Sequence, residues 1–302
     1  MALVNEHFLK LPGNYLFADV AKRVNAFKVS HPKERVISLG IGDVTQPLCP
    51  AVIEAMHKAV DEMATKASFH GYGPERGYEF LREAILKNDF LPRGIHLDAN
   101  EIFINDGAKS DTANIQELLR WDNNIGATDP IYPVYTDSNA MIGRAGLFAD
   151  GRWSNVTYFP CTAENNFIPE LPDRHMDMIY LCYPNNPTGT VLPKEELRKW
   201  VNFALRTDSI IFYDAAYEAF IQDDSIPHSI YEIKEARKCA IEFRSYSKTA
   251  GFTGIRCGYT VIPKELTATT LNEGNRVNIN QLWDRRQSTK FNGTSYVSQR
   301  AA

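Results

Sequence analysis

Short apolar runs that end in small or polar residues recur along the chain and constrain its fold more than any other feature. Most are nearly continuous in Val, Ile, Leu, Phe and Tyr, which is typical of strands covered on both faces. They occupy residues 35–43, 101–108, 124–130, 176–184, 209–217, 239–247 and 257–263. The sequence therefore predicts a mainly parallel, seven-stranded sheet with helices on both faces.

Helical patterns separate many of these runs. We expect helices at residues 51–64, 78–90, 109–121 and 193–206, and Pro193 followed by acidic residues is a good helix start. Alternating strands and helices predict an α/β fold with right-handed crossovers. The first thirty residues hold a further helical pattern, 14–27, which we expect to form an arm and helix outside the sheet.

Composition excludes several classes of protein. The chain has 302 residues, is 44% hydrophobic and carries a net charge of −4, so it can bury a sizeable core and shows no basic stripe for nucleic acid. No apolar run is long enough to span a bilayer, and the start lacks a signal-peptide pattern. The five cysteines are scattered without a CxxC pair, which disfavours disulfides and a structural metal site and favours the cytoplasm.

Chemistry-bearing residues cluster where the predicted strands end. In parallel sheets, ligands bind beyond the carboxyl ends of the strands. The groups that stand there are Gly42–Asp43, Asp106–Lys109, Asp129–Tyr132, Pro184–Gly189, Asp214–Tyr217 and Ser245–Lys248. They are distant in sequence and would share one edge of the sheet, so we expect a single site there.

Lys248 is the residue around which this site is interpreted. A lone lysine at a strand end is usually a surface charge, but Lys248 follows a buried strand and precedes glycines that allow close backbone approach. A desolvated lysine can form a Schiff base with an aldehyde. Ser245 and Arg256 are suited to a phosphate. A phosphate beside such a lysine points to pyridoxal 5′-phosphate (PLP).

PLP makes further demands that the chain can meet. A carboxylate at the pyridine nitrogen keeps the ring protonated, and Asp214 is the best candidate, with a helix cap as the alternative. Tyr217 and Asn186 could hold the ring oxygen O3′, although the segment NNPTG around Asn186 could also be a simple turn. Tyr132 suits stacking on the ring, with core packing as its alternative. Backbone amides for the phosphate are expected at Gly107, Ala108 and Lys109, at a strand-to-helix turn.

Two other motifs are weaker. Residues 245–248 match the S-x-x-K pattern of serine β-lactamases, but the S-D-N and K-T-G motifs that accompany it are missing. Residues 71–77, GYGPERG, loosely resemble a dinucleotide-binding loop, but their spacing is wrong and a helix precedes them.

The motifs NNPTG, DAAY and SYSKTAGFTGIRCG, in this order, resemble the PLP-dependent aminotransferases of fold type I, classes I and II. The segments NYLFADVAKRV, LGIGDVTQPL, GYGPERG, NDGAKSD, DPIYPVYTDS, YPNNPTGTVL and TKFNGTS narrow the resemblance to the LL-diaminopimelate aminotransferases, over essentially the whole chain. The alternatives left open are another class I/II aminotransferase, acting on aspartate, aromatic or branched substrates, and an inactive PLP-binding remnant.

The resemblance implies a ping-pong transamination between LL-diaminopimelate and 2-oxoglutarate, for lysine and diaminopimelate synthesis. Lys248 would be the catalytic residue. The cofactor-binding residues would be Ala108, Lys109, Tyr132, Asn186, Asp214, Tyr217, Ser245, Lys248 and Arg256. The substrate-binding residues would be Tyr15, Gly42, Tyr72, Glu75, Lys109, Tyr132, Asn186 and Asn292, several of them reaching the site of a partner chain in a homodimer. Glu75 is expected to recognise the distal ammonium group of the substrate.

The resemblance also implies a division of the chain. Residues 1–45 would form an N-terminal arm and the start of the small domain, and residues 46–302 the large PLP-binding domain. The C-terminal small domain of the family, with an arginine for the substrate α-carboxylate, is expected to be missing. We therefore expect the 302 residues to bind PLP and to transaminate poorly on their own.

Overall fold

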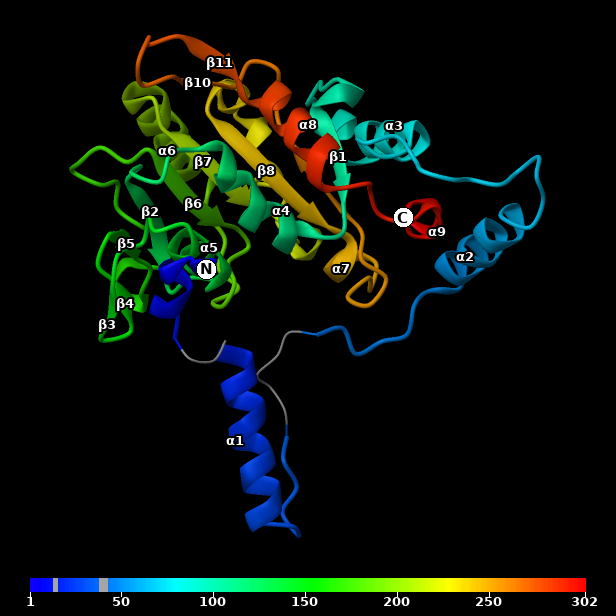
Figure 1. Ribbon diagram of the computed structural model, residues 1–302, viewed down its shortest axis with the longest axis horizontal. Helices are drawn as coiled ribbons and strands as arrows, with labels where there is room; N and C mark the ends of the chain where they lie inside the picture. Colours follow the sequence, from blue (N-terminus) through cyan, green and yellow to red (C-terminus); the bar gives the residue numbers. More distant parts are fainter. Residues whose placement is uncertain (13–15, 38–42) are drawn as a thin grey trace.

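A seven-stranded sheet forms the centre of the protein (Figure 1). The computed structural model describes residues 1–12, 16–37 and 43–302. The strand order is β1-β9-β8-β7-β6-β2-β5; β5, β2, β6, β7 and β8 run parallel to one another, and β9 is antiparallel to both of its neighbours. The bounds are β1 Ile102–Asn105, β2 Ile125–Asp129, β5 Val156–Pro160, β6 Met178–Cys182, β7 Ile210–Asp214, β8 Ala240–Ser245 and β9 Gly258–Val261. The prediction of a mainly parallel, seven-stranded sheet is confirmed.

One predicted strand falls largely outside the described residues, and one strand escaped prediction. The described part of the run 35–43, residues 35–37 and 43, forms no strand, and residues 38–42 lie outside the described residues. The seventh strand is instead β5, at the edge of the sheet. Only Val156 and Phe159 of its residues are buried, because an edge strand is less covered than the central strands, so β5 lacks the continuous apolar pattern used to find the others.

Helices follow most strands, as expected. Their bounds are α1 Leu16–Ser30, α2 Pro50–Glu62, α3 Glu79–Ile85, α4 Ala108–Asn114, α5 Val134–Met141, α6 Lys194–Thr207, α7 Tyr246–Thr249, α8 Ile279–Lys290 and α9 Tyr296–Ala301. The helix predicted at 109–121 is shorter than expected: α4 passes into a 3-10 turn, Ile115–Leu118, and Leu119 is extended. Two small hairpins, β3 Phe148–Ala149 with β4 Arg152–Trp153 and β10 Thr267–Thr269 with β11 Arg276–Asn278, lie outside the main sheet. None of the helices in the described ranges has the length and apolar character needed to cross a membrane.

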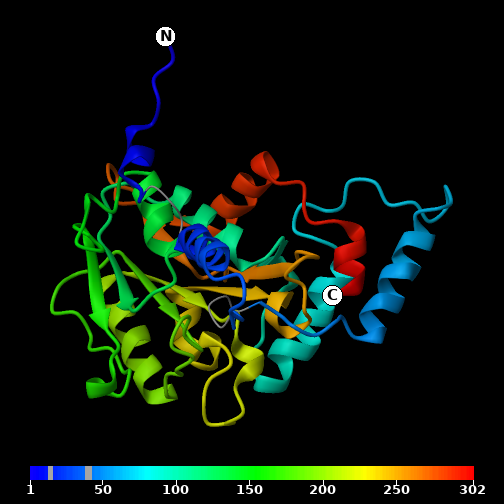
Figure 2. The same ribbon diagram turned by 90° about the horizontal axis from the view of Figure 1, so that it is seen from below.

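The sheet separates two hydrophobic cores. Alternate residues of each strand point to opposite faces. Ile179 and Leu181 of β6 join the core that contains α3 and α6, whereas Met178 and Tyr180 join the core that contains α4, α5 and α8. Figure 2 shows the sheet between these layers, with α8 and α4 on one side and the yellow-green α6 on the other. Burial on both faces explains the continuous apolar runs in the sequence.

The N-terminal helix lies apart from these layers. Helix α1 projects from the body of the protein, as Figure 1 shows. Helix α9 packs against α2 at the side of the molecule, where the Tyr296 hydroxyl donates to Glu62. The expectation of an N-terminal helix outside the sheet is met.

Candidate functional site

The strand-end lysine lies at the carboxyl edge of the sheet. Strand β8 leads directly into α7, and the side chain of its last residue, Ser245, caps α7 by accepting a hydrogen bond from the Ser247 amide at 3.2 Å. Lys248 is half-buried in α7, with its Nζ 5.7 Å from the centre of the Tyr217 ring. Burial lowers the pKa of Lys248, and the negative charge of Asp43 opposes this shift. A lowered pKa favours the neutral amine, the form that acts as a nucleophile and base.

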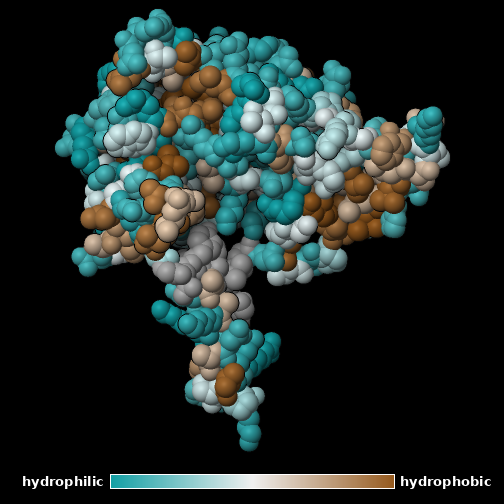
Figure 3. Space-filling view, viewed as in Figure 1, coloured by the Kyte–Doolittle hydropathy of each residue, from teal (hydrophilic) through white to brown (hydrophobic). Residues whose placement is uncertain are grey.

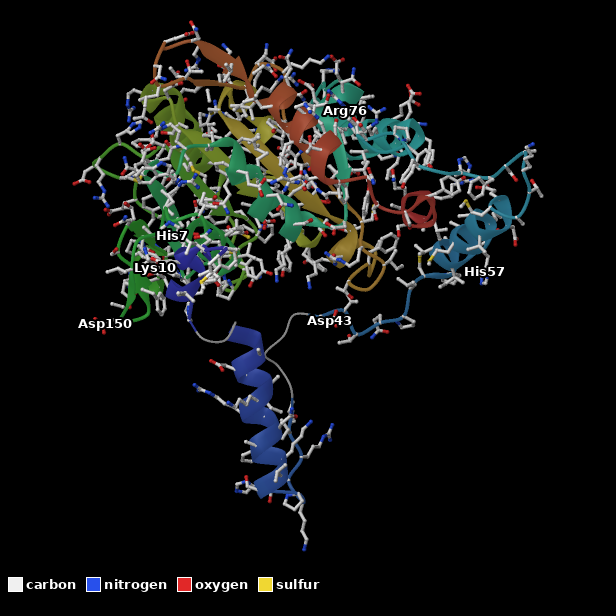
Figure 4. The ribbon with its side chains drawn as sticks, viewed as in Figure 1. His7, Lys10, Asp43, His57, Arg76 and Asp150 are labelled. Atoms are coloured by element: carbon white, nitrogen blue, oxygen red, sulfur yellow. The ribbon has the colours of Figure 1, made fainter. Side chains whose placement is uncertain are left out.

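Asp43 reaches this region from a different part of the chain. It lies on the connection from α1 to α2, on the side of the sheet where α7 lies (Figure 4). Its neighbour Gly42 and the more distant Tyr15, both predicted to bind substrate, lie outside the described residues.

A guanidinium group and a glycine turn meet next to α7. Arg256 Nη1 donates to the Ser247 hydroxyl and to the Thr253 carbonyl, each at 3.2 Å. Gly107, between β1 and α4, has φ +119°, and a Cβ at this position would lie 2.4 Å from Arg256 Nη2. Only glycine therefore allows the guanidinium to lie against this turn.

A buried carboxylate, Asp111, stabilises the glycine turn through the side chain of Asn105. The Asn105 side-chain oxygen accepts from the Gly107 amide at 2.9 Å, and the Asn105 Nδ2 donates to Asp111 at 2.7 Å. Burial raises the pKa of Asp111 to about 6. The first residues of α4 follow the turn, and of these Ala108 is buried and Lys109 is exposed. Arg256, the turn and the adjacent Ser245 together suit an anion with several oxygens.

Asp214 is a buried carboxylate at the carboxyl end of β7. It is 7% exposed, and its oxygens accept hydrogen bonds from the Tyr135 hydroxyl and, at 3.0 Å, from the Ala216 amide. Burial raises the pKa of Asp214, and these two hydrogen bonds oppose the shift. Within the described ranges no Lys, Arg or His forms an ion pair with Asp214. A buried carboxylate without a counterion is costly, so this position suits a cationic ligand atom.

Two further predicted site residues, Asn186 and Tyr217, are in contact with each other. Asn186 Nδ2 donates to the Tyr217 hydroxyl at 3.4 Å, although 31 residues separate them. Burial raises the pKa of Tyr217 to about 12, so its phenol is neutral and can donate. Tyr132 is partly buried just before α5, and its ring meets that of Tyr135 edge-on at 5.7 Å between centroids.

Tyr135 did not emerge from the sequence as a site residue. It is fully buried in α5 and donates to Asp214. The available signal was its spacing: it lies three residues after Tyr132, and it is the second residue of a helix that starts at Val134. No helix was predicted at this position, so the two tyrosines could not be placed together from the sequence.

Three predicted substrate residues lie at the surface, outside this group. Tyr72 is 92% exposed, and Glu75 accepts a hydrogen bond from Ser288 of α8. Their loop is fixed through Arg76, labelled in Figure 4, which donates to Asp284 at 2.7 Å. Asn292 is exposed beyond α8.

The end of α8 nevertheless leads back to the site. Thr294, two residues after Asn292, donates through its hydroxyl to the Arg256 carbonyl at 2.9 Å. This bond fixes the segment that holds Asn292 against the loop that holds the guanidinium group.

The residues present fit PLP. A buried carboxylate lacking a cation suits the protonated ring nitrogen, and paired Asn and Tyr side chains suit the ring oxygen. A guanidinium group against a glycine turn suits the phosphate, and a lysine with a lowered pKa suits the aldehyde. In the part of the chain that the structure describes, no group of His, Cys, Asp and Glu side chains could hold a metal ion.

Comparison with known proteins agrees with this geometry. The family model of aminotransferase class I and II matches residues 34–285. The chain belongs to the class I and II aminotransferases. Members of this family depend on PLP, so PLP is the cofactor of the protein.

Close relatives carry one name. The chain is 71% identical to the LL-diaminopimelate aminotransferase of Bacteroides thetaiotaomicron, over 100% of this chain and 74% of that protein. It is 70% identical to the enzyme of the same name from Phocaeicola vulgatus, with the same coverage. The solved L,L-diaminopimelate aminotransferase of Chlamydomonas reinhardtii is 40% identical, has a TM-score of 0.90, and matches 99% of this chain and 72% of its own. The family resemblance inferred from the motifs is confirmed.

Proposed function

We propose that the protein transfers an amino group from LL-2,6-diaminopimelate to 2-oxoglutarate, giving tetrahydrodipicolinate and glutamate. The observation that carries this proposal is 71% identity over the whole chain to a protein named LL-diaminopimelate aminotransferase. The convergence of Lys248, Asp214 and Arg256 at one edge of the sheet supports it independently. The keto product of diaminopimelate loses water when its remaining amino group closes the ring.

The chain's residues would hold PLP at four points. Asp214 binds the ring nitrogen, Asn186 and Tyr217 bind O3′, and Tyr132 lies against the ring face. The phosphate is bound by Arg256, Ser245 and the amides of Ala108 and Lys109. When bound, PLP supplies an electron-accepting ring that stabilises the charge left when the Cα–H bond of the amino acid breaks.

Lys248 moves the proton. As a neutral amine, Lys248 removes the proton from the substrate Cα and delivers it to the C4′ atom of the cofactor. Partial burial lowers the pKa of Lys248, which keeps more of the amine in the form that accepts a proton. In the second half of the cycle, with 2-oxoglutarate, Lys248 carries a proton in the opposite direction.

Substrate binding requires residues that a single chain leaves at its surface. We propose that Tyr72 and Glu75 reach the site of a second copy of this chain in a homodimer, and that Tyr15, Gly42 and Asn292 complete the substrate site. The surface over α2 and the loop after it is rich in apolar side chains (Figure 3). Its exposed members include Ile53 and Val60 of α2 and Phe69 and Tyr72 of the following loop, and Phe80 at the start of α3 is also exposed. Exposed apolar groups of this size mark interaction surfaces.

We further propose that residues 1–45 act as the arm beside a PLP-binding domain formed by residues 46–302. The projection of α1 from the body supports this division. Val29 of α1 is 83% exposed, which fits contact with another chain.

The activity can be tested with the PLP-loaded protein. Adding LL-diaminopimelate should bleach the long-wavelength absorbance of the bound cofactor, and 2-oxoglutarate should restore it with release of glutamate. Aspartate, aromatic and branched amino acids serve as competing substrates. If any of these bleaches the cofactor at lower concentration than LL-diaminopimelate does, the proposed substrate is wrong.

Glu75→Gln tests the distal ammonium group directly. It should weaken the use of LL-diaminopimelate about tenfold and spare substrates without a second amino group. Glu79→Gln, an exposed glutamate at the start of α3, is the matched control. Equal losses for both substrate classes would show that Glu75 does not read this group.

The dimer has its own test. Val60→Glu, on the exposed face of α2 within the apolar surface, should shift the sedimentation of the protein from dimer to monomer, because a charge would be buried at the interface. Leu205→Glu on α6 is the control, since Leu205 is also exposed but belongs to another surface. A monomeric parent protein would contradict the shared site.

A further inference from the structure

The carboxylate of Asp214 is held by a side chain from a different layer of the protein. Tyr135, from α5, donates its hydroxyl proton to Asp214 Oδ2, across 79 residues of sequence. The Ala216 amide binds the other oxygen, Oδ1, at 3.0 Å. A carboxylate has about four acceptor positions, so the two bonds fix its plane and leave positions for a ligand.

Tyr135 is itself firmly placed. Its ring is fully buried and stacks on that of Tyr180 of β6, with 5.3 Å between centroids and 14° between planes. Its other neighbour is the edge-on ring of Tyr132 at 5.7 Å. One side chain therefore contacts both the proposed ring-stacking residue and the proposed ring-nitrogen ligand.

A buried network of hydrogen bonds holds the stacked rings of Tyr135 and Tyr180 in place. Asn139 Nδ2 donates to the Tyr135 carbonyl and, at 2.9 Å, to the Tyr180 hydroxyl. Arg144, which is 3% exposed, donates to the Asn139 side-chain oxygen and to the Leu119 carbonyl at 2.9 Å. These contacts leave Tyr135 little freedom to turn its hydroxyl away from Asp214.

Among the described residues, those that neighbour Asp214 on the adjacent strands and on the next loop are neutral. Cys182 lies opposite Asp214 on β6, Phe243 lies opposite it on β8, and Tyr217 follows on the next loop. Burial raises the pKa values of Cys182 and Tyr217, so both stay protonated at neutral pH. The hydrogen bonds of Tyr135 and Ala216 are thus the chain's own means of favouring the charged carboxylate.

We propose that Tyr135 is a positioning residue that keeps Asp214 ionised and oriented, and thereby keeps the proton on the ring nitrogen of the bound cofactor. The proposal rests on the assignment of Asp214 to the ring nitrogen in the proposed function. Without the hydroxyl, the carboxylate becomes more basic and competes with the ring nitrogen for their shared proton. The ring then accepts electrons less well, although every group that touches the cofactor is still present.

The test uses 4-deoxypyridoxine 5′-phosphate, an analogue that lacks the aldehyde, so that Lys248 forms no bond to it. Two quantities are measured on the full chain: the pH dependence of the analogue's dissociation constant, and the ¹⁵N chemical shift of its labelled ring nitrogen. Tyr135→Phe keeps the stacked ring and removes only the hydroxyl. Tyr180→Phe is the matched control, because it removes a buried hydroxyl from the same stack that does not bind Asp214.

Tyr135→Phe should move the acidic limb of the binding curve to higher pH by about one unit, since a hydrogen bond to a charged group is being lost. The ¹⁵N signal should move towards that of the unprotonated ring. Tyr180→Phe should leave both unchanged. An unchanged limb and signal in Tyr135→Phe would overturn the proposal, as would equal changes in both variants.

Asp214→Asn distinguishes a failure of the role proposed for Tyr135 from a failure of the assignment of Asp214 to the ring nitrogen. Adding Tyr135→Phe to Asp214→Asn should change neither quantity further, because the acceptor is already gone. If Asp214→Asn alone has no effect, the assignment of Asp214 is wrong and the role of Tyr135 falls with it. If Asp214→Asn has its effect and Tyr135→Phe has none, only the role of Tyr135 is wrong. If Tyr135→Phe folds poorly, the ¹⁵N shift of the analogue bound to the parent protein still tests the proposal. That shift must be the one of a protonated ring nitrogen, and the shift of an unprotonated ring would overturn the proposal.

Discussion

Two buried carboxylates lie on neighbouring strands of the sheet and have opposite surroundings. Glu242 of β8 is completely buried, and Arg244 Nε donates to it at 2.6 Å, while Ser229 and the Ile230 amide bind its other oxygen. Asp214 of β7 has a hydroxyl and an amide as partners. Glu242 points towards the core with α6, and Asp214 towards the core with α5.

The difference in partners distinguishes a carboxylate that stabilises the fold, Glu242, from one that suits a ligand, Asp214. Glu242 has its cation within the chain, and Arg244 continues to Glu218 at 3.1 Å, so this network is complete without a ligand. Asp214 lies at the strand's carboxyl end, where ligands of parallel sheets bind, and its charge is balanced by no cation in the described part of the chain. A buried acid without a counterion, at this edge of a sheet, is therefore the stronger sign of a ligand site.

Arg244→Met should have the largest effect on stability. It leaves the buried Glu242 without its cation and removes one of the two partners of Glu218, which also contacts His228 Nδ1 at 2.9 Å, and this should lower the free energy of unfolding by about 3–5 kcal/mol. Urea denaturation of the cofactor-free protein at pH 7 measures this change. The double variant Arg244→Met with Glu242→Gln should recover part of the loss, because the unpaired charge of Glu242 is also removed. If Arg244→Met alone stays within about 1 kcal/mol of the parent, the Arg244–Glu242 ion pair contributes no more than a weak surface ion pair does.

A third buried acid, Asp111, sharpens the comparison because its partners are neutral. Burial raises its pKa to about 6, above the ordinary value near 3.8, so between these pH values the folded state binds more protons than the unfolded state. Its contribution to stability therefore falls as pH rises from about 4 to 6 and is lowest above 6. Asp111→Asn, whose amide oxygen can accept from both Asn105 and Thr260, should be more stable than the parent above pH 6 by at most about 3 kcal/mol.

The measurement for Asp111 is the free energy of unfolding of parent and variant from pH 4 to pH 8. The difference between the two should grow up to pH 6 and then stay level. A constant difference over the whole range would show that Asp111 does not titrate in this window.

Asp214→Asn should behave unlike Arg244→Met. The pKa of Asp214 is raised by burial, so removing the charge should leave the cofactor-free protein at least as stable at pH 7. PLP should bind about 30-fold more weakly, equivalent to about 2 kcal/mol, because the ring nitrogen loses its charged partner. Equilibrium binding and urea denaturation measure the two effects. A loss of stability as large as that of Arg244→Met would make Asp214 a structural acid.

Gly107→Ala should have the smallest effect and acts at the phosphate end. Gly107 has φ +119° and its added Cβ would lie 2.4 Å from Arg256 Nη2, so both backbone strain and a clash are expected. Gly94→Ala is the matched control, with φ +70° and no atom within 4 Å of the added Cβ. Both should lose about 1–2 kcal/mol of stability, and only Gly107→Ala should weaken PLP binding. Equal PLP affinities for the two variants would remove Gly107 from the phosphate site.

The sequence by itself determined six of the seven strands of the sheet, β1, β2, β6, β7, β8 and β9, because strands buried on both faces must be apolar at nearly every position. It also predicted that Lys248, Asp214 and Tyr217 lie at one edge of the sheet, since strand ends in a parallel sheet converge whatever the details of packing. Edge strand β5 escaped because it is less covered than the central strands, and only Val156 and Phe159 of its residues are buried.

Only the tertiary structure decided which buried groups are paired. Arg244 and Glu242 are two residues apart, but their isolation from water and their link to Glu218 depend on the layers above and below the sheet. The contact between Tyr135 and Asp214 joins a helix to a strand 79 residues away. Hydrogen bonds of this kind require atoms to be placed within a few tenths of an ångström. That placement comes from packing of the whole core and leaves no periodic signal in the sequence.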